Sequence, residues 1–138
     1  MQKLNIERTA LTPGIRFSPD ENVFFIRGTS SPEDVRALYY PVTDWIRKFT
    51  EEVLNGKYKS FSNENSLRFQ IDLNYFNSSS AKFFYDILLE LNKLPYAGVP
   101  VNVEWYYDEE DTDMKEAGAD ISLLVEMEFT FIAKPSED

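Results

Sequence analysis

The sequence predicts an α/β protein, a two-layer sandwich with a mixed sheet of about five strands and its helices mainly on one face. Segments with the two-residue alternation of a strand are separated by segments with the apolar spacing of a helix. In the middle of the chain the order is strand, helix, strand, which implies parallel strands joined by a right-handed crossover. The 138 residues, 43% of them hydrophobic, suit one domain over residues 1–138 with an ordered core at about 14–132.

The first predicted elements are a hairpin and a long helix. The short apolar segments Ile15–Phe17 and Val23–Arg27 flank a turn rich in polar residues, which indicates two paired strands at one side of the sheet. Ser31 suits the N-cap of a helix that ends near Gly56. Pro41 lacks an N–H donor, so we expect a kink or a fresh start of the helix there.

The central strands and helix have the clearest patterns. Leu67–Leu73 and Val101–Tyr107 each alternate apolar with polar residues, as a strand with one buried face does. Between them, residues 81–94 carry the apolar spacing of a helix. The polar residues 57–65 predict an ordinary loop before the first of these strands.

The last part of the chain predicts a short helix and a final strand. We expect the helix from Thr112 to Ala117, ending near Gly118 because glycine favours helix termination. Apolar residues then alternate from Val125 to Phe131, which predicts the last strand. The residues from Lys134 onward are expected to fray.

Composition excludes several classes of function. The chain has no cysteine and no histidine, which removes thiolate nucleophiles, Ser-His and Cys-His catalytic systems and most transition-metal sites. We therefore expect no enzymatic activity and no cofactor. The net charge of −10 argues against nucleic-acid and anionic-membrane partners, which require Lys and Arg. Without a membrane-spanning run or a signal peptide pattern, the protein is expected in the cytoplasm.

Four polar residues, Asn77-Ser78-Ser79-Ser80, fall between the first central strand and its helix. The start of a helix leaves four backbone N–H groups unpaired and favours bound phosphate. Serine is also a good N-cap, so these serines have a structural role as well. A phosphate would add charge and acceptor oxygens here, and Lys82 lies one turn further on.

An acidic segment follows the second central strand, with carboxylates at Asp108, Glu109, Glu110, Asp111 and Asp113. Such a cluster can hold a hard cation, but the glycine and glutamate of an EF-hand are missing at the required spacing. A solvated acidic loop is the simpler interpretation, and we predict no metal site. Exposed aromatics beside carboxylates suit a protein interface, so Tyr106, Tyr107, Asp108 and Glu109 are predicted to contact a partner.

Three motifs together resemble the SiaC-type regulatory phosphoproteins. They are Pro41-Val42-Thr43-Asp44-Trp45, Tyr75-Phe76-Asn77-Ser78-Ser79-Ser80-Ala81-Lys82 and Trp105-Tyr106-Tyr107-Asp108-Glu109-Glu110-Asp111. The resemblance extends from about Gly14 to Ile132. It implies a fold like the STAS domains of anti-sigma-factor antagonists.

The resemblance also implies a function in partner switching. Such a protein is phosphorylated by a serine/threonine kinase, dephosphorylated by a PP2C-type phosphatase, and binds a target such as a diguanylate cyclase in one state. The modified residue carries over to Ser78, with Ser79 and Ser80 as alternatives, and Asn77 and Lys82 are expected to support the phosphate. Two other functions stay open: a constitutive protein-interaction or small-ligand-binding domain, and a small carboxylate-dependent enzyme.

Overall fold

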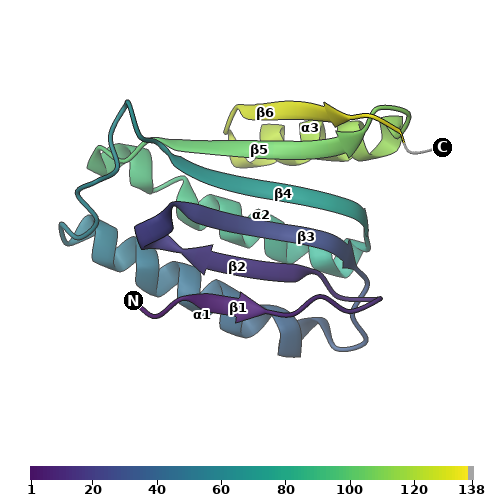
Figure 1. The fold of residues 1–138 in the computed structure, drawn as a ribbon, viewed down its shortest axis with the longest axis horizontal. Helices are drawn as coiled ribbons and strands as arrows, with labels where there is room; N and C mark the ends of the chain where they lie inside the picture. Colours follow the sequence, from purple (N-terminus) through teal and green to yellow (C-terminus); the bar gives the residue numbers. More distant parts are fainter. Residues whose placement is uncertain (137–138) are drawn as a thin grey trace.

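A computed structural model describes residues 1–136 and confirms the two-layer α/β sandwich (Figure 1). One layer is a six-stranded sheet in the order β1-β2-β3-β4-β5-β6. Its strands are β1 (Leu4–Ile6), β2 (Gly14–Ser18), β3 (Val23–Ser30), β4 (Leu67–Phe76), β5 (Val101–Asp108) and β6 (Phe129–Lys134).

The second layer covers one face of that sheet with the α-helices (Figure 1). Its helices are α1 (Val35–Leu54), α2 (Ser78–Leu91) and α3 (Thr112–Val125), and two short 3-10 turns, η1 (Pro19–Glu21) and η2 (Leu94–Ala97), connect elements. Within residues 1–136 no helix has both the length and the apolar character that crossing a membrane requires.

The pairing of the strands decides where the loops lie. β1, β2 and β3 are antiparallel, whereas β3, β4, β5 and β6 pair in parallel. The carboxyl ends of these four strands therefore meet at one edge of the sheet, where parallel α/β folds place their functional residues. The start of α2 and the loop after β5 both lie at this edge (Figure 1).

The sheet has one strand more than the sequence predicted. Leu4 pairs with Phe17 and Ile6 with Ile15, so β1 adds an edge strand beside the predicted hairpin. A strand of three residues is too short to show the two-residue alternation, and for that reason the sequence pattern did not predict β1.

α1 begins later than expected and is not interrupted. Its N-cap is Asp34, whose side chain accepts a hydrogen bond from Ala37 N at 3.1 Å, so the prediction of Ser31 as the cap was wrong. The helix continues through Pro41, where a kink or a fresh start was expected, so there is no fresh start. A stripe of buried side chains, among them Tyr39, Ile46 and Phe49, packs α1 onto the sheet, and this burial outweighs the missing hydrogen bond.

α3 is also longer than the sequence predicted. It runs through Gly118 and ends at Val125, and β6 begins only at Phe129. Gly118 has a packing role instead, because a Cβ there would lie 2.5 Å from Nε1 of the buried Trp105. The same indole nitrogen donates a hydrogen bond to Met114 O at 3.0 Å, which holds α3 against β5.

The end of the chain is anchored as far as it is described. Lys134 Nζ lies 2.6 Å from Asp72 Oδ1, and Ser136 Oγ donates to Asp108 Oδ1 at 2.6 Å. The prediction that residues from Lys134 fray was therefore wrong up to Ser136. Residues 137–138 lie outside the described part of the chain.

Gly118→Ala should destabilise the protein by about 1–3 kcal/mol, because the methyl group collides with a fully packed indole. Helix propensity alone predicts the opposite sign, a gain of about 1 kcal/mol. Urea unfolding of Gly118→Ala relative to the parent, and of the Trp105→Phe Gly118→Ala double variant relative to Trp105→Phe, separates the two effects. The smaller ring should relieve the collision, so an equal loss in both backgrounds would contradict this packing.

A candidate phosphorylation site at the start of helix α2

The start of α2 is organised by Asn77. This residue is the N-cap, with φ −86° and ψ 170°, and its Oδ1 accepts hydrogen bonds from Ser80 N and from Ser79 Oγ, both at 3.0 Å. We expected the serines themselves to cap the helix, and that expectation was wrong. Asn77 accepts a hydrogen bond from the Ser80 amide, which would otherwise be unpaired. The three serines therefore form the first turn of α2 and do not cap it.

The three serines have different surroundings. Ser78 and Ser79 are exposed, whereas Ser80 is fully buried. Ser79 is engaged by the cap residue, and Ser78 is the first residue of the helix. Ser78 is therefore an exposed residue at the turn where α2 begins.

A chain of buried hydroxyl groups fixes this turn from below. Tyr39 OH lies 2.5 Å from Ser30 Oγ, Ser30 Oγ donates to Ser80 Oγ at 2.8 Å, and Ser80 Oγ donates to Ser30 O at 3.2 Å. Since the Ser30 hydroxyl already gives its proton to Ser80, Tyr39 is the donor to Ser30. Burial raises the pKa of Tyr39 to about 12, so the phenol stays protonated.

The end of β3 also holds the cap residue directly, because Asn77 N donates to Ser30 O at 3.0 Å. Two consecutive elements, β3 and α1, thus meet the start of α2, which is distant from them in the sequence, at one buried point. Sequence patterns mark Ser30 and Tyr39 only as a strand end and a helix residue. Their joint role depends on the parallel pairing of β3 with β4.

Lys82 and an unpredicted residue, Arg36, flank the exposed serines. Both line a hollow of about 430 Å³ together with Val35, Tyr40, Ser78, Ser79 and Phe83. Lys82 Nζ is 3.6 Å from Asp86 Oδ2 and lies 5.6 Å from the centre of the Phe83 ring. Arg36 belongs to the first turn of α1, so no local motif connects it with the serines.

The acidic segment is used for local structure. Asp108 Oδ1 accepts from Glu110 N at 2.9 Å and from Ser136 Oγ at 2.6 Å, and the bonds from Ser136 and Glu110 lower the pKa of Asp108. Asp111 caps α3 by accepting from Met114 N at 3.0 Å. In the part of the chain that the structure describes, no group of three or more possible ligands is placed to hold a metal ion.

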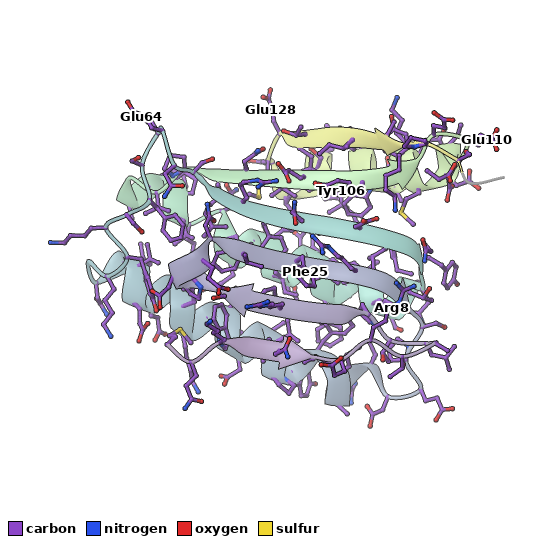
Figure 2. The ribbon with its side chains drawn as sticks, viewed as in Figure 1. Arg8, Phe25, Glu64, Tyr106, Glu110 and Glu128 are labelled. Atoms are coloured by element: carbon purple, nitrogen blue, oxygen red, sulfur yellow. The ribbon has the colours of Figure 1, made fainter. Side chains whose placement is uncertain are left out.

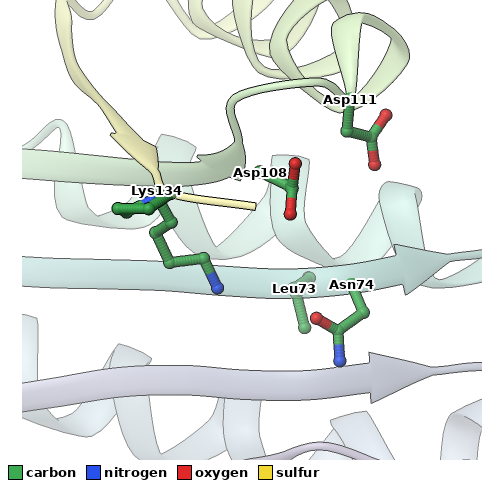
Figure 3. Close-up of a pocket in the computed structure, with 6 residues that line it drawn as sticks. Leu73, Asn74, Asp108, Asp111 and Lys134 are labelled. Atoms are coloured by element: carbon green, nitrogen blue, oxygen red, sulfur yellow. The ribbon is translucent and has the colours of Figure 1, made fainter. Parts of the chain in front are cut away.

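A second hollow joins this acidic segment to β4. It measures about 500 Å³ and is lined by Leu73, Asn74, Asp108, Asp111, Lys134 and Pro135 (Figure 3). Asn74 lies three residues before Asn77, so the acidic segment and the serine turn occupy neighbouring parts of the same sheet edge.

The predicted contact tyrosines lie on opposite faces of the sheet. Tyr106 lies on the face without helices (Figure 2), where its hydroxyl accepts from Gln70 Nε2 at 3.0 Å and donates to Glu104 Oε1 at 3.1 Å. Tyr107 packs against the core on the helical side, with Lys115 Nζ 5.6 Å from its ring centre. The two rings do not belong to a single surface.

Glu104 is the centre of a polar network on the open face. It is only 8% exposed and accepts from Arg68 Nη2 and from Gln70 Nε2, both at 2.9 Å. Burial acts to raise its pKa, but the bonds from Arg68, Gln70 and Tyr106 together outweigh burial and leave the pKa below its ordinary value.

The fold is a small α/β sandwich with an exposed serine at the capped start of α2. Comparison with known proteins identifies it further. The chain belongs to the SiaC family of regulatory phosphoproteins, whose sequence model matches residues 6–134. The predicted family resemblance is thereby confirmed.

Individual relatives agree with this assignment. An uncharacterized protein of Pseudomonas aeruginosa strain UCBPP-PA14 is 29% identical over 116 residues, which are 84% of each chain. Apo-SiaC of Pseudomonas aeruginosa has 27% identity and a TM-score of 0.79, over 96% of this chain and 100% of that one.

A solved complex contains another similar chain. The complex holds the diguanylate cyclase SiaD of Pseudomonas aeruginosa with its activator SiaC. The similar chain in it has 26% identity and a TM-score of 0.76, over 96% of this chain and 99% of that chain. The likeness to STAS domains stays a prediction.

Asn77→Ala should lower the free energy of unfolding by about 1 kcal/mol, because the Ser80 amide loses its acceptor. Asn77→Asp is the matched control, since aspartate caps a helix equally well. Thermal or urea unfolding measures both. Equal losses in the two variants would mean that the cap is not what stabilises this turn.

Glu104→Gln should reduce the acid sensitivity of the protein. A carboxyl whose folded pKa is depressed stabilises above its unfolded pKa, and this contribution is lost as the pH falls through the folded value. The loss of unfolding free energy between about pH 5 and about pH 3 should therefore be smaller in Glu104→Gln than in the parent. Glu128→Gln, which removes an exposed carboxylate, should keep the parental slope; equal slopes in both variants would contradict the network's role.

Proposed function

We propose that this chain is a phosphorylation-controlled partner-switching protein, modified on Ser78, which binds a signalling target in one of its two states. The observation that carries the proposal is the exposed Ser78 hydroxyl at the first position of α2, in a member of a regulatory phosphoprotein family. A phosphate adds about −1.5 to −2 charge and strong acceptor oxygens, enough to change what this surface binds.

The surroundings of the three serines favour Ser78 as the acceptor. A kinase needs a hydroxyl that enters its own active site, and Ser80 is fully buried beneath the turn. Ser79 is exposed but donates its proton to Asn77 Oδ1 at 3.0 Å, and modification there would disturb the cap. Ser78 can take a phosphate without loss of these bonds, and the helix dipole favours the added negative charge.

The proposed partners are a serine/threonine kinase, a PP2C-type phosphatase and a target, for which a diguanylate cyclase is the first candidate. Support for the cyclase comes from the similar SiaC of Pseudomonas aeruginosa, which is the activator of SiaD. We infer a binding role without catalysis, because the chain lacks histidine and cysteine, which most enzymes use as general base or nucleophile. We also propose that the protein acts in the cytoplasm.

The partner surface that we propose is the sheet edge around Ser78, extended by Asp108 and Glu109. The hollow between β4 and the acidic segment supports this continuity. Tyr106 and Tyr107, which we also predicted as contacts, point to opposite faces and are half-buried. The two tyrosines are therefore better suited to pack behind the proposed partner surface, one on each face of the sheet, than to form its main contact area.

Ser78→Ala should abolish phosphate incorporation while leaving the fold intact, because the hydroxyl is exposed and outside the cap. Intact-mass spectrometry of protein isolated from its own cells, with and without phosphatase treatment, measures this. Ser79→Ala is the matched control and should retain the phosphate. A phosphate that persists in Ser78→Ala and disappears in Ser79→Ala would move the site by one residue, and no phosphate in the parent would contradict the switch.

A further inference from the structure

The hollow beside Ser78 has an unusual charge for this protein. The chain as a whole carries 24 acidic and 14 basic residues. Of the described residues that line the hollow, Arg36 and Lys82 are cations and none is a carboxylate. The hollow at Ser78 and Ser79 is therefore lined by positive charge, although the protein as a whole is acidic.

The two cations come from different helices. Arg36 is the second residue of α1, and Lys82 is the fifth residue of α2. The remaining lining is largely apolar, with Val35, Tyr40 and Phe83 beside the serines. A group bound between the cations would connect the first turns of α1 and α2.

Both cations are available for a new partner. The bond from Lys82 to Asp86 is a surface i,i+4 pair at 3.6 Å whose lysine side chain is 74% exposed, and such pairs contribute only about 0.3–0.5 kcal/mol. None of the ion pairs among residues 1–136 involves Arg36. Little interaction free energy is therefore lost when the Arg36 and Lys82 side chains turn toward an anion.

We propose that Arg36 and Lys82 form a clamp that binds the phosphate of phosphorylated Ser78 within the same chain. The inference rests on the proposed function, in which Ser78 is the modified residue. A phosphoserine carries about −1.5 to −2 charge, which matches the two positive charges of the clamp. The planar guanidinium of Arg36 binds two phosphate oxygens at once, and Lys82 exchanges Asp86 for the phosphate.

The clamp changes what a partner meets at this edge. Before modification the hollow presents two cations to an approaching protein, and afterwards their charge is cancelled and the hollow is filled. The switch thus removes a positive contact in addition to adding a bulky anion. Aspartate at position 78 has one charge and cannot span both cations, so Ser78→Asp should imitate the modified state poorly.

Phosphorus-31 NMR of the chain with phosphoserine genetically encoded at position 78 tests the clamp. Nearby cations favour the dianion, so the phosphate of the folded chain should titrate at lower pH than that of the same chain unfolded in urea. In the Arg36→Gln Lys82→Gln double variant, about half or more of this difference should disappear, the remainder arising from the amides at the start of α2.

The matched control is Arg47→Gln Lys93→Gln, which removes one arginine from α1 and one lysine just beyond the end of α2, away from the hollow around Ser78. It should leave the titration within experimental error of the parent. Equal shifts in both double variants, or none in either, would overturn the clamp. Because the phosphoserine is encoded, a failure here is distinct from a failure of kinase labelling at Ser78, which alone would contradict the proposed function.

Discussion

The buried hydroxyl chain from Tyr39 through Ser30 to Ser80 is the constraint on which the serine turn depends. It joins the end of β3, the first turns of α1 and the start of α2, at distances of 2.5 to 3.2 Å. A buried hydroxyl without a partner is costly, so each member of the chain fixes the position of the others. Ser80 is held beneath the turn and Asn77 caps the helix, while Ser78 stays exposed at the hollow between α1 and α2.

Parallel strand pairing extends this local arrangement to a whole edge of the molecule. Right-handed crossovers place α2 after β4 and α3 after β5 on one face, so the start of each helix lies at the same edge. The acidic residues gathered there act as caps and loop anchors, as Asp108 and Asp111 show. The hollow lined by Arg36 and Lys82 lies between the starts of α1 and α2 and is separate from the hollow at the acidic segment.

Much of the fold could be predicted from the sequence wherever the periodic pattern of apolar residues was long. The alternation from Leu67 to Leu73 and the helical spacing after Ala81 located β4 and α2, although the serines form the first turn of α2 and do not cap it. Failures occurred where tertiary contacts override local signals. Gly118 indicated a helix end, yet the indole of Trp105 requires a residue without a side chain inside α3. Likewise, the contribution of Arg36 depends on the packing of α1 beside α2, for which no sequence period exists.

The central claim is that Ser78 is the one hydroxyl of the triplet that both reaches solvent and is left free by the cap. Fragment-ion mass spectrometry of the phosphopeptide from the native, unsubstituted protein tests it most directly, since the fragment masses assign the phosphate to a single residue. We expect fragments that carry the phosphate at position 78. Fragments that place it on Ser80, which the fold buries, would contradict the account.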